Sequence, residues 1–215
     1  MPKLVDLLNK NKMTLIVALP KNDLELAAAA VSSGADALLL GLGGKKESLK
    51  KVLDKVNVPV GIAINGGKAG NEKEVKEILK LGFDFFTAGL EGVPAYLQEM
   101  KRVSRVLSLD SRFSVDALIE ISKVKAEALD AAIIPVSGEG KELVVGDLQN
   151  YISIVLSAGI PVIIPTQRSI KASEVAIIAD TGAKGLLLSA VVIGSDAGSV
   201  GKAVREYRLA VDELE

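Results

Sequence analysis

Residues 173–190 read SEVAIIADTGAKGLLLSA and decide the fold class. Residues 173–181 have the apolar spacing of a helix, Gly182 ends that helix, and residues 184–189 form an almost unbroken apolar run. Strands that are buried on both faces of a parallel sheet have this continuous apolar character. The segment therefore predicts a helix that packs on a buried parallel strand and is joined to it by a glycine turn.

The same strand–helix unit recurs along the chain, with comparable turns GAD at 34–36 and GFD at 82–84. Eight units follow one another at intervals of about 20 to 30 residues, the spacing of a repeated β/α unit. We expect strands at 13–19, 36–40, 58–64, 83–88, 105–109, 130–136, 161–164 and 184–189. We expect helices at 23–33, 47–56, 72–81, 94–102, 115–124, 146–157, 173–181 and 200–214.

Eight regular units favour an α/β protein with a closed (β/α)8 TIM barrel. The rival architecture is an open doubly wound sheet, which has about five or six strands and a topological switch point. Residues 3–11, ahead of the first strand, predict a short N-terminal helix that caps the bottom of the barrel. No linker or run of charges divides the chain, so we expect a single domain over residues 1–215.

Composition restricts the chemistry that the chain can perform. The net charge is −1 and the basic residues are scattered, which gives no electrostatic basis for binding nucleic acid or a membrane surface. The chain has neither Cys nor His, so acid–base work falls to Asp, Glu, Lys or Tyr, and no cofactor is clearly implied, although Mg²⁺ and FMN stay open. No long apolar run or secretion signal is evident, so we expect a cytoplasmic protein.

In a barrel of this kind the loops that follow the strands form the site. Asp110, after the fifth strand, is a candidate general base or Mg²⁺ ligand, and Lys21 and Glu91 are further candidate catalytic residues. Each has a simpler alternative: Asp110 caps a helix or pairs with Arg112, and the long side chains of Lys21 and Glu91 are solvated.

Two glycine-rich stretches, GLGGK at 41–45 and NGGK at 65–68, follow strands and precede helices. Backbone N–H groups at such positions bind anions, but glycines also serve simply to make tight turns. We take Asn65, Lys68 and Ser137 as candidate substrate-binding residues.

The loops after the seventh and eighth strands predict a phosphate site, because these loops often form one together with a short extra helix. Arg168 is suited to hold phosphate in a bidentate fork, and residues 190–193 predict the short helix. The alternative is that Arg168 is solvated and residues 190–193 pack in the core. The candidate phosphate-binding residues are Thr166, Gln167, Arg168, Ser189, Ala190, Gly194 and Ser195.

Residues 161–195, and above all GAKGLLLSA at 182–190, resemble the C-terminal quarter of the ribulose-phosphate-binding barrels. This aldolase-type superfamily includes thiamine-phosphate synthases, sugar-phosphate epimerases and keto-deoxy-phosphogluconate aldolases. The resemblance implies a (β/α)8 barrel and places phosphate-binding amides at Ser189 and Ala190. The chain departs from the pattern at Thr166-Gln167-Arg168, which replaces the glycine pair of the superfamily. It also lacks the Schiff-base Lys of the aldolases in the sixth strand and the Asp-x-Lys-x-x-Asp array of the decarboxylases in the third.

Three functions remain open at this point. The first is an enzyme that isomerises, epimerises or joins small phosphorylated metabolites, and the second is a ligand-binding or regulatory barrel without chemistry. The third is an FMN-binding barrel. All three imply a small-molecule phosphate ligand or none, no nucleic acid and no membrane, and all leave a homo-oligomer open.

Overall fold

The computed structural model describes residues 3–43, 45–64, 72–90, 95–100, 102–114, 118 and 125–214. Its eight strands form a closed barrel in chain order, and each strand runs parallel to both of its neighbours. The prediction of a closed (β/α)8 barrel is therefore confirmed. The strands are β1 (Thr14–Ala18), β2 (Ala37–Gly41), β3 (Val60–Ile64), β4 (Phe85–Gly89), β5 (Ser104–Ser108), β6 (Ala128–Asp130), β7 (Val162–Pro165) and β8 (Gly185–Leu188).

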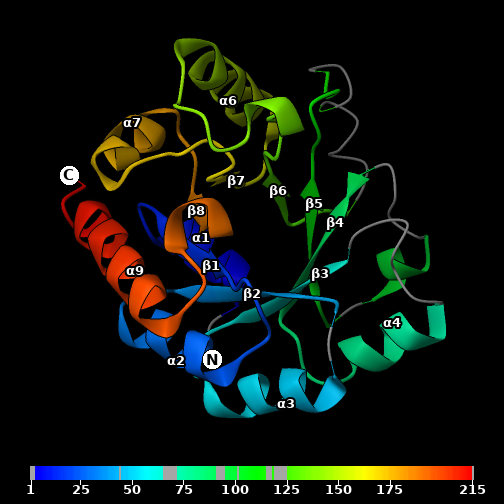
Figure 1. Cartoon of the computed structure of the whole chain (residues 1–215). Helices are drawn as coiled ribbons and strands as arrows, with labels where there is room; N and C mark the ends of the chain where they lie inside the picture. The colour runs from blue at the N-terminus through cyan, green and yellow to red at the C-terminus, as the bar shows by residue number, and fades with distance from the viewer. Residues whose placement is uncertain are drawn as a thin grey trace.

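Helices surround the strands, as Figure 1 shows. They are α1 (Leu4–Lys10), α2 (Leu24–Ser32), α3 (Lys46–Lys55), α4 (Glu72–Leu79), α6 (Val145–Ala158), α7 (Val175–Asp180), α8 (Ala190–Ile193) and α9 (Ala197–Asp212). The helix expected at 94–102 is a shorter 3-10 helix, η2 (Ala95–Glu99), and most of the one expected at 115–124 lies outside the described residues. Among the residues described, no helix is both long and apolar enough to cross a membrane.

The inside of the barrel is filled by one set of alternating strand residues, and α1 closes its N-terminal end. The Leu4 N–H donates to Asp84 Oδ2 at 2.9 Å, which fixes the start of α1 beneath β4. The predicted helical cap at the bottom of the barrel is thereby confirmed. The interior cluster comprises Leu4, Leu8, Ile16, Ala37, Leu39, Phe85, Val106, Ala128, Ile163 and Leu187.

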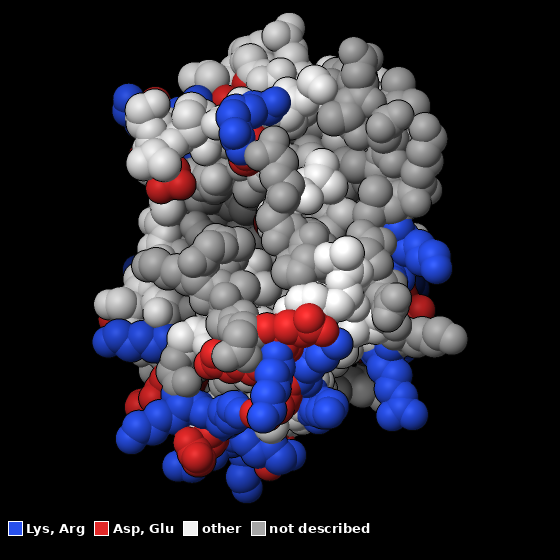
Figure 2. Space-filling model, turned by 90° about the vertical axis from the view of Figure 1, so that its right-hand side faces the viewer, with Lys and Arg blue, Asp and Glu red and all other residues white. Residues whose placement is uncertain are grey.

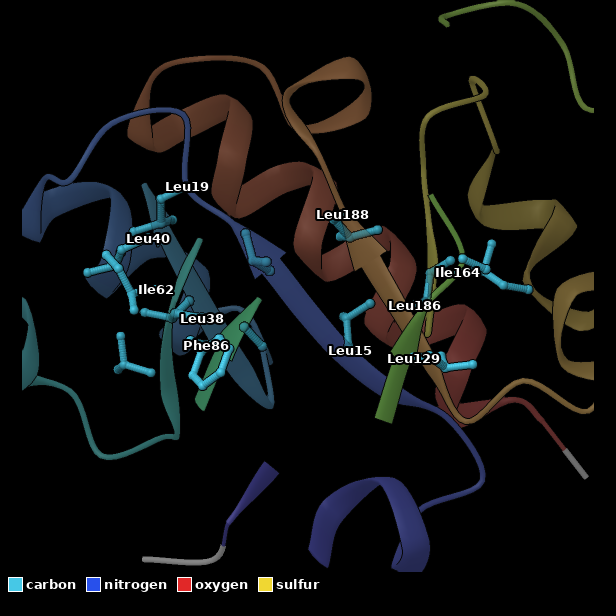
Figure 3. Packing of buried hydrophobic residues seen from close by; sticks show 14 of the residues in the cluster. Leu15, Leu19, Leu38, Leu40, Ile62, Phe86, Leu129, Ile164, Leu186 and Leu188 are labelled. Carbon is cyan, nitrogen blue, oxygen red and sulfur yellow. The ribbon is translucent and has the colours of Figure 1, made fainter. Parts of the chain in front are cut away.

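The other set of strand residues packs outward against the helices, as Figure 3 shows for part of this larger cluster. Leu15, Leu38 and Ile62 belong to this outer layer and are fully buried. Aliphatic side chains dominate it, in keeping with an aromatic content of 3%. Both faces of each strand are thus buried, which explains why the strands appear in the sequence as continuous apolar runs.

Strand β6 differs from the expectation in a way that matters for function. The apolar run at 130–136 predicted a strand beginning at Asp130, but β6 ends there. Beyond it the chain turns, because the Ile133 N–H donates to the Ala131 carbonyl at 2.8 Å, and Ile134 is held instead by the Gln167 side chain. Asp130 therefore lies at the C-terminal end of the barrel.

Candidate functional site

The C-terminal end of the barrel is lined by small residues on its inner face. Ala18 and Ala63 pack on the interior cluster and are partly exposed. Gly41 and Gly89 end β2 and β4, are exposed, and have nothing within 4 Å of where a Cβ would lie. The described residues thus leave room above the interior cluster at this end, whereas α1 fills the opposite end.

Ser108 and Asp130 face each other within this lining. They are register partners at the ends of β5 and β6, and both point inward, because Val106 and Ala128, two residues earlier, belong to the interior cluster. Ser108 Oγ donates a hydrogen bond to Asp130 Oδ2 at 2.7 Å. Ser108 is partly exposed, whereas Asp130 is only 7% exposed.

The carboxyl of Asp130 is an unusual group for a protein interior. Its Oδ1 atom is buried and has no hydrogen-bond partner among the described residues. Burial raises the pKa of Asp130 to about 6, and the hydrogen bond from Ser108 offsets part of that rise. Such a carboxyl changes its protonation state near neutral pH, which is what proton transfer requires.

Sequence reasoning missed Asp130 because it placed the residue at the opposite end of its strand. Pro135 is the signal that could have corrected this, because proline lacks an N–H and is excluded from the middle of a central strand. A strand over 130–136 contains that proline, whereas one that ends at Asp130 does not.

Two of the predicted phosphate-binding residues, Thr166 and Ser189, lie together and join the loops after β7 and β8. The Ser189 N–H donates to Thr166 Oγ1 at 2.9 Å, and Ser189 Oγ donates to the Thr166 carbonyl at 3.0 Å. Ser189 also caps α8, since its Oγ accepts from the Val191 N–H at 3.3 Å. One amide that the superfamily resemblance assigned to phosphate, that of Ser189, is therefore already bonded within the protein.

The next amide, that of Ala190, is not bonded to any of the described residues. Ala190 is the first residue of α8 and is exposed, and its N–H has no acceptor among the described residues. Gly194 and Ser195, which follow α8, are also exposed.

Gln167 and Arg168, in contrast, turn toward the chain after β6. Gln167 Oε1 accepts from the Ile134 N–H at 3.1 Å. Arg168 forms a bidentate pair with Asp147 of α6, with Nε–Oδ2 at 2.8 Å and Nη2–Oδ1 at 3.1 Å, and its Nη1 donates to the Gly138 carbonyl at 3.0 Å. The guanidinium fork that we expected on phosphate is thus directed at a carboxylate, and phosphate binding by Arg168 stays a prediction.

Two of the predicted catalytic residues, Asp110 and Lys21, are described, and no hydrogen bond links either side chain to Asp130 among the described residues. Asp110 is exposed and paired with Arg112, whose side-chain and then backbone hydrogen bonds hold the pKa of Asp110 below its usual value. Lys21 is exposed, as is Ser137 in the 3-10 helix η3 (Val136–Gly138). Glu91, Asn65 and Lys68 lie outside the described residues.

Charged side chains of both signs lie together on one part of the outer surface. Figure 2 shows Lys, Arg, Asp and Glu intermixed over the lower part of the face in view, at the level of α3 and α4. Lys46 pairs there with Glu77 at 2.6 Å. Within the described ranges, no group of three or more Asp and Glu side chains is arranged to hold a metal ion.

Solved structures share this architecture over nearly the whole chain. A thiamine phosphate pyrophosphorylase from Pyrococcus furiosus has a TM-score of 0.70 at 21% identity, and the match covers 94% of this chain and 97% of that one. Phosphoribosyl anthranilate isomerase from Thermus thermophilus has a TM-score of 0.72 at 17% identity, covering 94% and 100%. Tryptophan synthase from Mycobacterium tuberculosis has a TM-score of 0.73 at 13% identity, covering 98% and 99%.

The chain has the fold of the aldolase-type barrels. No family model matches the sequence, and no curated protein matches it either. At the identities observed, the likeness establishes the fold and leaves the reaction to be argued from the site.

Proposed function

We propose that the protein is an enzyme that acts on a small phosphorylated metabolite at the C-terminal end of its barrel, as an isomerase, epimerase or synthase. The observation that carries this proposal is the N–H of the exposed residue Ala190 at the start of α8, next to the loop after β7, for which the described residues provide no acceptor. Backbone N–H groups at such a position are suited to a phosphate oxygen.

The surrounding structure holds this amide in place. Thr166 is fully buried, and its three hydrogen bonds with Ser189 fix the residue immediately before Ala190. A donor fixed before the ligand arrives does not have to be ordered when the ligand binds, so less binding energy is lost. Two proteins with the same fold, the thiamine phosphate pyrophosphorylase and the phosphoribosyl anthranilate isomerase, carry phosphate compounds in their names, which supports the same ligand class here.

The substitution Ala190→Pro tests the proposal by deleting one N–H. Proline is well tolerated at the first residue of a helix, and the extended conformation of Ser189, with φ −102° and ψ 171°, is compatible with a following proline. We expect isothermal titration calorimetry with inorganic phosphate and with ribulose 5-phosphate to show an affinity loss of about 10-fold or more, the value of a hydrogen bond to a charged group.

Ala190→Gly is the matched control, because it retains the N–H and should bind like the wild type. Equal binding by the proline and glycine variants, or no binding of either probe by the wild type, would contradict the proposal. Binding of phosphorylated probes with no turnover would favour the ligand-binding barrel, and a flavin absorption spectrum in the purified protein would favour the FMN alternative.

A further inference from the structure

We infer that Ser108 and Asp130 form a proton-transfer pair, in which Asp130 takes up the proton that a bound ligand loses, through the hydroxyl of Ser108. This inference rests on the proposed function, because it needs a ligand at the C-terminal end of the barrel. It adds the residues that perform the chemistry and the class of ligand that they accept.

The two side chains have different roles: Ser108 contacts the ligand, and Asp130 is the final proton acceptor. Asp130 is 7% exposed, so a ligand meets the partly exposed Ser108 first. Ser108 Oγ directs its hydrogen at Asp130 Oδ2 over 2.7 Å, which leaves the lone pairs of the hydroxyl free to accept a proton from the other side. Ser108 is thus placed to pass a proton inward without a movement of Asp130.

Other shielded carboxylates in this chain serve the structure, and Asp130 does not resemble them. Asp84 accepts from the Leu4 N–H, Asp36 accepts from the Leu15 N–H and pairs with Arg208, and Asp147 pairs with Arg168. The carboxyl of Asp130 instead accepts one hydrogen bond, from Ser108, and its other oxygen has no partner among the described residues. An unsatisfied buried carboxyl is destabilising, so its presence at the active end of a barrel points to a catalytic role.

The proposed step is balanced without an oxidant or reductant. A C–H bond next to a carbonyl group of the ligand breaks, its proton moves to Ser108 Oγ, and the Ser108 proton moves to Asp130 Oδ2. The electron pair stays on the ligand as an enolate, and the reverse transfer returns a proton to the same or the neighbouring carbon. The ligand class is therefore a small phosphorylated aldose or ketose.

The surroundings of Asp130 suit this cycle. Burial raises its pKa to about 6, near the pH at which a general base works best. Among the described residues, the titratable group on which the charge of Asp130 acts is Tyr151 of α6, a phenol whose pKa burial holds far above neutrality. Tyr151 therefore stays neutral while Asp130 titrates.

The experiment follows uptake of solvent deuterium by proton NMR, using ribulose 5-phosphate and dihydroxyacetone phosphate in D₂O. For a probe that binds, the wild type should exchange its carbon-bound proton. Asp130→Asn and Ser108→Ala should each slow the exchange by about 100-fold or more, the usual value of general acid–base catalysis, with dissociation constants within about 3-fold of wild type. Ser108→Thr retains the hydroxyl and should restore most of the rate.

Asp84→Asn is the matched control, because it makes the same change in a half-buried carboxyl at the opposite end of the barrel. It should exchange at the wild-type rate. Thermal melting of every variant separates loss of chemistry from loss of folding.

Exchange by Asp130→Asn at a rate within about 3-fold of wild type overturns the inference. So does loss of exchange in Asp110→Asn alone, which would make Asp110 the base. A wild type that binds the probes without exchanging them refutes the proton-transfer pair and leaves phosphate binding intact. A wild type that binds neither probe refutes the proposed function itself.

Discussion

At the scale of single residues, Asp130 shows how a catalytic group can weaken the fold that carries it. Its pKa rises from an ordinary value of 3.8 to about 6 on folding, so the unfolded chain releases the proton first as the pH increases. The stability of the folded state is therefore highest below about pH 4 with respect to this group, and it falls until the pH passes about 6. The total loss is on the order of 3 kcal/mol.

Replacing Asp130 with Asn should remove this loss. Relative to wild type, the free energy of unfolding of Asp130→Asn should increase between about pH 4 and pH 6 and stay constant above, because the neutral amide cannot ionise. Urea denaturation at several pH values measures the difference. Asp180→Asn, at an exposed position at the end of α7, should follow wild type across this range. A difference between Asp130→Asn and wild type that does not change with pH would show that Asp130 is not perturbed by burial.

The sequence predicted the neighbours of some site residues and not of others, and the reasons are physical. It placed Thr166 and Ser189 together because both follow strands that are neighbours in a barrel. It did not find the partner of Arg168, since Asp147 is 21 residues away on α6 and the path of the intervening loop decides which groups meet. Asp130 was missed through a boundary error, because apolar composition alone does not separate a strand from the apolar turn that follows it.

At the scale of elements, the loops after β6 and β7 are joined into one layer. The Gly140 N–H donates to the Gln167 carbonyl, and the Ser169 N–H donates to the Lys141 carbonyl, both at 2.8 Å. The Arg168–Asp147 pair lies beside these bonds, with side-chain exposures of only 14% and 9%. These bonds hold the loops after β6 and β7 together beside the site. They fix the end of β7 and, through Thr166, the start of α8.

Breaking the Arg168–Asp147 pair should destabilise these joined loops. Arg168→Met leaves Asp147 as a buried, uncompensated charge and should lower the free energy of unfolding by about 3–5 kcal/mol. Lys171→Met is the control, because its pair with Glu142 has 61% and 84% exposed side chains and should contribute less than about 1 kcal/mol. Urea denaturation of both variants makes the comparison. Equal effects would mean that water screens the Arg168 pair as well.

At the scale of the whole molecule, α1 fills one end of the barrel, whereas the described residues leave room at the other end, and this asymmetry is what makes a site. The sequence predicted the closed barrel because the spacing of the units and the apolar character of their strands recurred along the chain, with comparable glycine turns in three of them. It could not predict how the interior is filled, because that depends on which residues meet across the strands. Gly61 and Phe85 illustrate this: they are register partners on β3 and β4, and the ring occupies the space where a Cβ of residue 61 would lie.

Gly61→Ala should therefore be overpacked. Its new methyl group overlaps the Phe85 ring between two fixed strands, so we expect a loss of about 1–3 kcal/mol in the free energy of unfolding. Gly41→Ala, at the open end of β2, meets nothing within 4 Å and should change stability by less than about 0.5 kcal/mol.

A double-mutant cycle with Phe85→Leu separates overpacking from a backbone effect of glycine. If the ring causes the strain, Gly61→Ala with Phe85→Leu should be more stable than the sum of the single changes predicts, by about 0.5 kcal/mol or more. Additive effects would place the strain in the β3 backbone instead. A positive coupling here, together with the tolerance of Gly41, would show that the barrel interior is tightly packed around Phe85 and has room at the end of β2, the end of the barrel at which Ser108 and Asp130 lie.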